Sequence, residues 1–310
     1  MKVFKKINKA LRLYYEYRKV YKNYISVLLN AFLKNKESKR RNLTIKAKFR
    51  DGKVLQLPYG LIMVYANAKK SQNTRNIENV KIEKNILYFQ FYDKQLQFDM
   101  PPTSDPYATF FYEDYKFLRV NGKVVIDIGM NIGDSTIYFS IKGAKRVIGL
   151  EPFPYTFRYA EKNICLNNIL NCTLLNAGYG EDKEITVDQE IISTSGSSLV
   201  QTSKGKQIKL YSLSTLMKKY EIDSAIVKMD CEGCEYWLLN EPENVFNCIE
   251  MIQIEYHYGY KRLVDKLKSV GFNVEFTEPE FNYDIDAENP SQSIGYIFAE
   301  KQKIHNTSEF

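Results

Sequence analysis

The chain has 310 residues, of which 44% are hydrophobic and 26% are charged. A chain of this length and balance forms one sizeable core plus an accessory region, which excludes an intrinsically disordered protein. The net charge is +7, yet residues 1–41 alone hold thirteen Lys and Arg against two acids. The rest of the chain is therefore net acidic, and we expect no nucleic-acid partner.

Apolar stretches long enough to cross a membrane are missing, since none approaches the roughly 18 uncharged residues that a span requires. The N-terminus, which is rich in Tyr and Lys, also lacks the apolar core of a signal peptide. We therefore expect a cytoplasmic protein, with a membrane-peripheral location as the alternative.

Residues 1–41 form the first predicted unit. Apolar side chains recur at steps of three and four residues from Phe4 to Phe32, which places them on one helix face. We predict one long amphipathic helix over residues 3–35, with basic residues opposite the apolar stripe. Such a helix could dock on its own protein, self-associate or lie on an anionic membrane, and the sequence leaves these uses open.

Residues 42–106 form a predicted β-rich accessory region. Four short runs, NLTIKAKF, KVLQLP, ILYFQF and QLQFDM, are joined by turn signals such as Asp51-Gly52. Three prolines, at positions 101, 102 and 106, then interrupt the chain. A Tyr- and Phe-rich helix is predicted beyond them, around residues 108–118.

Strands and helices alternate over residues 107–303, and residues 304–310 form a tail. The strand patterns are VVIDIG, RVIGLE, TLLNA, AIVKMD and MIQIEY, and helices are predicted from Gly133 and from about Tyr155, Gly233 and Lys261. This alternation predicts an α/β fold, with a mostly parallel sheet covered by helices on both faces. The last two strand patterns, FNVEF and SIGYIFAE, have no helix between them, so we expect an antiparallel C-terminal hairpin at the sheet edge.

The most informative segment is VVIDIGMNIG, a predicted strand that ends in a tight turn before a helix. Gly129 and Gly133 permit positive φ, and the free N–H groups of the new helix favour polar or anionic ligand groups. Glu151 closes the next strand, where an acid is placed to bind ribose hydroxyls. The pattern predicts a nucleotide site; the alternative is a turn that binds no ligand.

This turn differs from the G-x-G-x-x-G of dinucleotide-binding folds, because Asn131 stands between the two glycines. It suits S-adenosylmethionine (SAM), which has no phosphate and whose amino-acid end needs N–H groups for its carboxylate and an acid for its amine. Asp127 could supply that acid, directly or through water.

Five cysteines are an odd number, which argues against a disulfide framework. Cys231 and Cys234 form a C-x-x-C that could be a redox pair or half of a zinc site. No second pair completes a zinc site, and the only histidines are His257 and His305. We therefore expect both cysteines to serve as packing residues.

The block KMDCEGCE completes a resemblance to a known family. Residues 127–134 read D-x-G-x-N-x-G-D, Glu151-Pro152 is an E-P after the second strand, and residues 228–235 read K-x-D-x-E-G-x-E. Three motifs in this order, over roughly residues 107–300, resemble the FkbM family of class I SAM-dependent methyltransferases. The segment SLSTL departs from the family pattern, which commonly has an Asp there.

The resemblance implies a Rossmann-like sheet of seven strands, SAM as cofactor, and methyl transfer to a hydroxyl of a sugar, glycan or glycolipid-like acceptor. By analogy, Glu151 holds the ribose, Asn176 or Ala177 borders the adenine, and Phe153 packs nearby. The residues that would hold the methionine end are Asp127, Gly129, Asn131 and Gly133.

Methyl transfer requires the acceptor, methyl group and sulfur in line, and a base must take the hydroxyl proton. Asp230 is the first candidate base, because ligands bind at the carboxyl ends of strands in open α/β sheets. Glu232 follows it closely, and His257 competes for the role of base. Lys228 could form an internal ion pair, and Glu235 could favour the start of the next helix. Carboxylates this close could hold Mg²⁺, but spacing alone does not establish a metal site and we expect none.

Two other classes of function stay open at the level of sequence. One is a nucleotide-binding oxidoreductase, and the other is a non-catalytic SAM-binding scaffold that recruits partners through its basic helix. The identity of the acceptor and the oligomeric state cannot be read from the chain.

Overall fold

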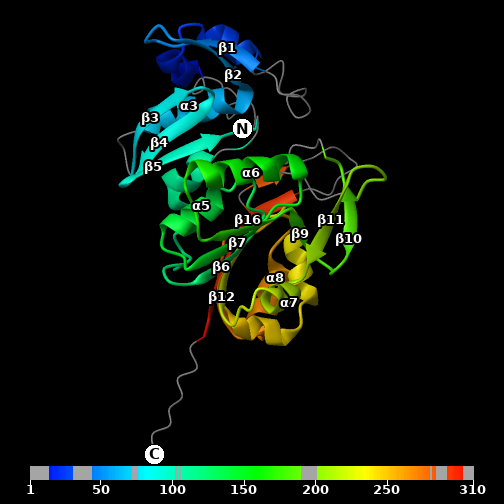
Figure 1. Cartoon of the computed structure of the whole chain (residues 1–310). Helices are drawn as coiled ribbons and strands as arrows, with labels where there is room; N and C mark the ends of the chain where they lie inside the picture. Colours follow the sequence, from blue (N-terminus) through cyan, green and yellow to red (C-terminus); the bar gives the residue numbers. More distant parts are fainter. Residues whose placement is uncertain are drawn as a thin grey trace, which may run out of the picture.

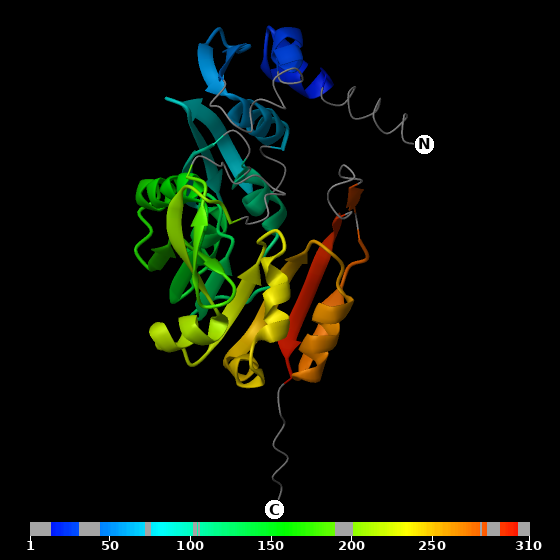
Figure 2. The same cartoon turned by 90° about the vertical axis from the view of Figure 1, so that its right-hand side faces the viewer.

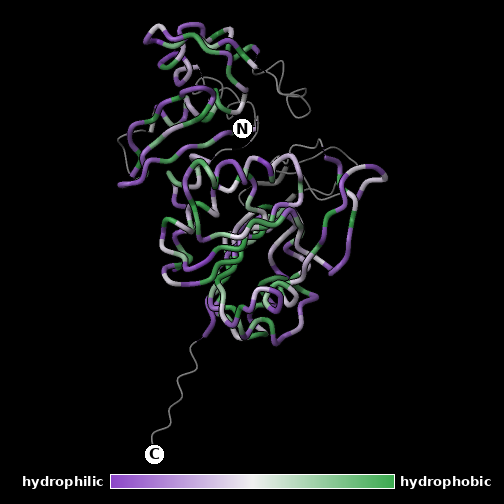
Figure 3. Tube along the Cα trace, viewed as in Figure 1, coloured by the Kyte–Doolittle hydropathy of each residue, from purple (hydrophilic) through white to green (hydrophobic). Residues whose placement is uncertain are grey.

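The computed structural model describes residues 14–30, 44–71, 76–101, 104, 106–189, 201–279, 281–283 and 292–302. Figures 1 and 2 show the N-terminal accessory region above an α/β body built around one twisted sheet. Hydrophobic residues follow the strands of this sheet (Figure 3). None of the described helices combines the length and the hydropathy needed to span a bilayer.

The N-terminal segment is helical over residues 14–20 and again over 24–30. Between them the backbone of Tyr21 forms an isolated bridge with Phe49, and its hydroxyl donates to the carbonyl of Ile62 at 2.9 Å. The prediction of one uninterrupted helix is therefore wrong at Tyr21, which leaves the helix to pair with the accessory region. Residues 3–13 and 31–35 of the predicted helix lie outside the described residues. Tyr17, Tyr21 and Val27 are buried, so one face of the described segment is docked on its own protein.

The accessory region contains two small antiparallel sheets and a helix. The two sheets have the orders β1-β2 and β3-β4-β5. The elements are β1 (Thr44–Lys48), β2 (Val54–Pro58), α3 (Tyr59–Ser71), β3 (Ile77–Glu83), β4 (Ile86–Phe91) and β5 (Lys94–Asp99). The four predicted runs became β1, β2, β4 and β5, whereas α3 and β3 were missed. Helix α3 was missed because it is buried on more than one side, at Leu61, Ile62 and Val64 among others. Its sequence therefore lacks the alternation of apolar and polar faces by which a helix is recognised.

A short helical segment joins this region to the body. It consists of α4 (Pro106–Ala108) and the π-helix η1 (Thr109–Glu113). The segment ends at Glu113, which adopts a φ of 49°, and so stops short of residue 118, the predicted end of the helix. Phe110 is fully buried and contacts the rings of Phe89, Phe91 and Tyr138. The accessory sheet and the body therefore share one aromatic core.

The main sheet has the order β14-β16-β13-β12-β6-β7-β8, with β15 (Phe281–Tyr283) paired to β16 off this path. Its strands are β6 (Val124–Ile128), β7 (Arg146–Leu150), β8 (Cys172–Leu175), β12 (Ala225–Met229), β13 (Ile249–Tyr256), β14 (Phe272–Phe276) and β16 (Gln292–Lys301). Neighbouring strands from β8 to β13 are parallel, and β16 is antiparallel to both β13 and β14. The predicted α/β class and antiparallel C-terminal hairpin are confirmed.

Helices cover both faces of this sheet (Figure 1). They are α5 (Asp134–Ile141), α6 (Pro154–Leu166), α7 (Leu213–Lys219), α8 (Lys261–Ser269) and two 3₁₀ helices, η2 (Cys234–Asn240) and η3 (Glu243–Cys248). The helix predicted from Gly233 is thus present as a 3₁₀ helix. A smaller sheet of order β10-β11-β9 lies beside the body, with strands β9 (Ala177–Tyr179), β10 (Glu184–Val187) and β11 (Lys206–Tyr211).

Candidate active site

The turn between β6 and α5 has three residues in the left-handed region: Gly129 (φ 80°), Asn131 (φ 50°) and Gly133 (φ 84°). The N–H groups of Gly129 and Met130 donate to the carbonyl of Leu150, at 3.0 and 2.9 Å, which ties the turn to the end of β7. A Cβ atom on Gly129 would lie 1.8 Å from the carbonyl oxygen of Asp230. Glycine is therefore required here, and it brings the turn against the end of β12.

Asp127 lies beneath this turn and is fully buried. Its Oδ2 accepts hydrogen bonds from Ser135 and Thr136, both at 2.7 Å, and its Oδ1 lies 3.2 Å from the Nζ of Lys228. Lys228 also donates to the carbonyl of Gly129 at 2.8 Å. The sequence allowed an internal ion pair between Lys228 and Asp230, whereas in the structure Lys228 pairs with Asp127. Asp127 therefore supports the turn from below, and it is absent from the residues that line the cavity described next.

A cavity of about 240 Å³ opens beside the turn, at the carboxyl ends of β12 and β13. Gly129 and Asn131 form one wall. Asp230, Glu255 and Gln253 also line the cavity. Further lining residues are Ser104, Ala108, Thr109, Asp114, Tyr115, Asp134, Ser135, Lys228, Met229 and Tyr296. Sequence reasoning missed Asp114, Tyr115 and Tyr296, because η1 and β16 bring them to the site from distant positions and no spacing in the chain signals this.

Glu151 lies at the end of β7, next to the turn, and is 2% exposed. Its Oε1 accepts a hydrogen bond from the N–H of Phe153 at 2.9 Å. Burial raises the pKa of Glu151 to about 8, although this hydrogen bond acts in the opposite direction. A buried acid of this kind gains when hydroxyl groups donate to it, which fits the hydrogen-bonding needs of a ribose.

The residues predicted to border the adenine gather near Glu151. The side-chain amide of Asn176 donates to the carbonyls of Glu151 and Pro152, at 2.9 and 3.2 Å. Phe153 and Ala177 are buried, at 5% and 3% exposure. The turn, Glu151 and Asn176 thus follow one another along the carboxyl ends of β6, β7 and β8, as an extended nucleoside requires.

Asp230 and Glu255 form a carboxyl pair on the cavity wall. Burial is the main cause that raises the pKa of Glu255 to about 9, and the charge and hydrogen bond of Asp230 raise it further. At neutral pH Glu255 is therefore protonated. Glu255 consequently offers a carboxylic acid to the cavity, next to the side chain of Asp230.

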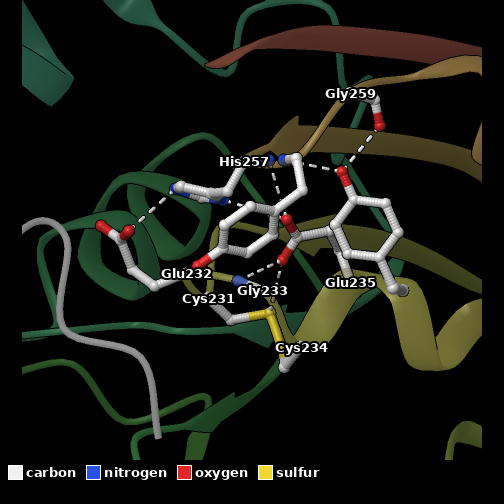
Figure 4. Close-up of polar contacts among 9 residues, drawn as sticks. Cys231, Glu232, Gly233, Cys234, Glu235, His257 and Gly259 are labelled. Carbon is white, nitrogen blue, oxygen red and sulfur yellow. Dashed lines mark hydrogen bonds and ion pairs between the residues drawn. A yellow bond between two sulfur atoms is a disulfide. The ribbon is translucent and has the colours of Figure 1, made fainter. Parts of the chain in front are cut away.

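His257 is 1% exposed and lies between two other carboxylates (Figure 4). Its Nε2 is 3.1 Å from Glu232, and its Nδ1 is 3.0 Å from Glu235. Burial alone would lower the pKa of His257, but the hydrogen bonds that its ring donates to Glu232 and Glu235 outweigh burial and raise the pKa to about 11. His257 is therefore an imidazolium at neutral pH, with no lone pair free to accept a proton.

The same geometry bears on metal binding. Ligand atoms of Asp230, Glu255 and His257 lie within 4.8 Å of one another. A metal ligand must be the neutral imidazole, whereas both ring nitrogens of His257 already face carboxylates. Among the described residues, these three are thus close enough to surround a cation but are not in the protonation state that coordination needs.

Cys231 and Cys234 are joined by a disulfide across a Cα–Cα distance of 5.5 Å. The expectation that they serve only as packing residues is therefore wrong. An odd number of cysteines does not exclude a single disulfide between close neighbours in the chain. The other three cysteines, at positions 165, 172 and 248, are free thiols. Glu235 stands in the first turn of η2, where an acid was expected to favour the start of the helix. It accepts hydrogen bonds from the N–H of Gly233 at 2.8 Å and of His257 at 3.0 Å.

Antiparallel β16 lies between β13 and β14, a glycine turn follows β6 and an acid follows β7. These are features of the class I SAM-dependent methyltransferase fold. Residues 127–274 match the family model of the methyltransferase FkbM domain, so this part of the chain is a methyltransferase domain of that family. SAM is accordingly its cofactor. No curated protein sequence is significantly similar to this chain.

Two solved structures illustrate what the fold is similar to. TYW2 from M. jannaschii, in complex with AdoMet, shares 15% identity over 72% of this chain and 89% of its own, with a TM-score of 0.39. A protein from Streptococcus mutans described as a methyltransferase, in complex with SAH, shares 16% identity over 62% of this chain and 97% of its own, also with a TM-score of 0.39.

Proposed function

We propose that this methyltransferase transfers the methyl group to a hydroxyl of a sugar, glycan or glycolipid-like acceptor, with Asp230 as the general base. The observation that carries the proposal is the Asp230–Glu255 pair on the wall of the cavity beside the glycine turn. SAM, when bound, supplies a methyl group on a sulfonium that needs no further activation. The task left to the protein is to orient the acceptor and remove its proton.

Asp230 is suited to the second task because its partner Glu255 keeps the proton of the pair. The carboxylate of Asp230 accepts the proton of the acceptor hydroxyl as the new bond forms. A base within hydrogen-bond reach typically contributes about 10²- to 10⁴-fold. The carboxylic acid of Glu255 donates to Asp230 and holds it toward the cavity.

His257 has a different role in this proposal from the base considered on sequence grounds. As an imidazolium it places a positive charge behind the carboxyl pair, and it fixes Glu232 at 3.1 Å and Glu235 at 3.0 Å. Glu232 thereby becomes a positioning residue. The polar wall and the rings of Tyr115 and Tyr296 support a polyol acceptor, because they combine hydrogen-bond acceptors with apolar ring faces.

On the cofactor side, the N–H groups of Gly129 and Met130 donate to Leu150, so the carboxylate of the methionine end is assigned to the N–H groups at the start of α5, which the turn presents. Glu151 is assigned to the ribose, and Asn176, Ala177 and Phe153 to the edge of the adenine. Asp127 supports the turn rather than reaching the ligand, because its carboxylate oxygens are used by Ser135, Thr136 and Lys228.

The N-terminal segment gives a second, separate proposal. Its outer face exposes Tyr15, Ile25 and Leu29, each by more than half, while the inner face is docked on the accessory region. We propose that this outer face contacts a second copy of the chain or a membrane surface in the cytoplasm.

The test of the catalytic proposal is Asp230→Asn, assayed for methyl transfer to a panel of sugar acceptors and for binding of S-adenosylhomocysteine. Turnover is expected to fall at least about a hundredfold while cofactor affinity stays within a few fold. Asp230→Glu is expected to restore part of the turnover. Asp223→Asn is the matched control, since Asp223 is an exposed acid at the other end of the same strand. Near-normal turnover in Asp230→Asn would reject Asp230 as the base.

A further inference from the structure

The disulfide between Cys231 and Cys234 lies directly after Asp230 and is not used by the chemistry described above. Both cysteines are half-buried, and the bridge spans a sequence separation of three residues. A loop this short has little conformational entropy to lose, so its closure adds little to the global stability of the fold. The effect of the bridge is therefore local.

What the bridge holds locally is an unfavourable backbone. Glu232 has a φ of 59° and Gly233 a φ of 115°, so both residues enclosed by the two cysteines are in the left-handed region. A non-glycine residue adopts this conformation only where its surroundings impose it. In this conformation the carboxylate of Glu232 reaches the Nε2 of His257, at 3.1 Å.

Glu235 connects the bridge to the site (Figure 4). Its Oε2 accepts the N–H of Gly233 at 2.8 Å and lies 3.6 Å from the Sγ of Cys231. Its Oε1 accepts both the backbone N–H and the ring Nδ1 of His257, each at 3.0 Å. One buried carboxylate thus contacts both the sulfur of the disulfide and the imidazolium.

We propose that Cys231 and Cys234 form a reversible redox site that controls the methyl-transfer centre, with the disulfide form as the ordered state. This inference rests on the proposed function, since it regulates the same site. The co-reactant is a dithiol. One of its thiolates attacks a sulfur of the bridge, the S–S bond breaks, and a mixed disulfide forms. The second thiol of the reductant displaces it, so the protein gains two electrons and two protons and the reductant leaves as a disulfide.

Reduction changes the contacts of His257 through two routes. The Cys231 thiol becomes a hydrogen-bond donor beside Oε2 of Glu235, and the freed loop lets Glu232 leave the left-handed region. The charged groups that face His257 are Glu232, Glu235, Asp230 and Glu255. Loss of the Glu232 contact removes one of the two carboxylates that keep the imidazolium charged. Asp230, one residue before the bridge, loses its fixed position at the same time.

The experiment compares the full chain in its air-oxidised state with the same protein treated with dithiothreitol. Alkylation and intact mass count the thiols, and imidazole NMR at about pH 9 reads the charge of His257. The chain has only two histidines, so a His305→Gln variant assigns the signals by elimination. We expect two extra alkylated cysteines after reduction, an imidazolium in the oxidised protein, and a pKa of His257 below about 9 in the reduced protein.

Two variants complete the design. The double variant Cys231→Ser with Cys234→Ser is expected to match the reduced protein and to ignore dithiothreitol. Cys165→Ser, which removes an exposed free thiol on α6, is expected to match wild type in both states. An unchanged His257 charge after complete reduction, or no gain of alkylated cysteines, would overturn the proposal.

The NMR and mass readouts need no acceptor, so they separate this inference from the function on which it rests. If Asp230→Asn keeps full turnover while His257 still responds to reduction, the catalytic assignment fails and the redox coupling stands. If His257 is indifferent to reduction while Asp230→Asn is inactive, the base assignment stands and the redox site is rejected. In the wild type, methyl transfer is expected to fall at least about tenfold on reduction and to return on reoxidation.

Discussion

Replacing Lys228 with Met is expected to destabilise the fold strongly, because it leaves a carboxylate buried without its counter-charge. Lys228 is 1% exposed and Asp127 is 0% exposed, and their charged atoms are 3.2 Å apart. Removing one member of a buried ion pair typically costs about 3–5 kcal/mol. That corresponds to roughly 10²- to 10⁴-fold in the unfolding equilibrium, or a urea midpoint lower by roughly 1–2 M.

The assay is a urea titration followed by the fluorescence of Trp237, the only tryptophan of the chain, which lies in η2 beside the site. Lys123→Met is the matched control, since its ion pair with Glu250 is 43% and 39% exposed and is expected to contribute less than about 1 kcal/mol. Asp127→Leu combined with Lys228→Met should recover part of the loss, because it removes the stranded charge as well. A Lys228→Met loss no larger than that of Lys123→Met would refute the reasoning.

Three further predictions follow from separate features of the molecule. Gly129→Ala should weaken binding of S-adenosylhomocysteine at least about tenfold in calorimetry, because the added Cβ would collide with the backbone of Asp230. Gly122→Ala is the control and should bind normally, since Gly122 also has a positive φ but its Cβ would meet open space. Stability should fall as pH rises from about 5 to about 9, because folded Glu255 keeps a proton that the unfolded chain has released. Glu255→Gln should flatten that slope by about 1.4 kcal/mol per pH unit in denaturant titrations, and an unchanged slope would contradict its raised pKa. Ile25→Glu with Leu29→Glu should lower the sedimentation mass or the vesicle binding of the full chain, and a wild type that shows neither would end the proposal for the N-terminal face.

The parallel sheet and its ligand-binding edge could be predicted because the relevant signals are local. Each β–α unit carries its own strand pattern, and the turn at Gly129 and the acid at Glu151 follow their strands directly. Periodicity and turn chemistry report such features within about ten residues. The C-terminal hairpin was predictable for the same reason, since two strand patterns met with no helix between them.

The missed features depend on long-range contacts. The helix break at Tyr21 follows from pairing with Phe49, and a helical pattern in the sequence gives no sign of it. Likewise, Tyr296 reaches the cavity only because β16 inserts between β13 and β14. The position of His257 at the end of a predicted strand suggested that it could act as a base. Its protonation is decided by Glu232 and Glu235, however, and only the folded chain brings these carboxylates to its ring.

The most direct test of the central claim is a calorimetric titration of the protein with S-adenosylhomocysteine, with NAD run alongside, repeated on Glu151→Ala. The account predicts saturable binding of S-adenosylhomocysteine alone and a loss of roughly 5- to 100-fold in Glu151→Ala, since a buried polar group that loses its hydrogen-bond partner costs about 1–3 kcal/mol. Glu161→Ala, at an exposed acid on α6, should bind as tightly as wild type. Binding of NAD instead, or no binding of S-adenosylhomocysteine by folded protein, would contradict the account.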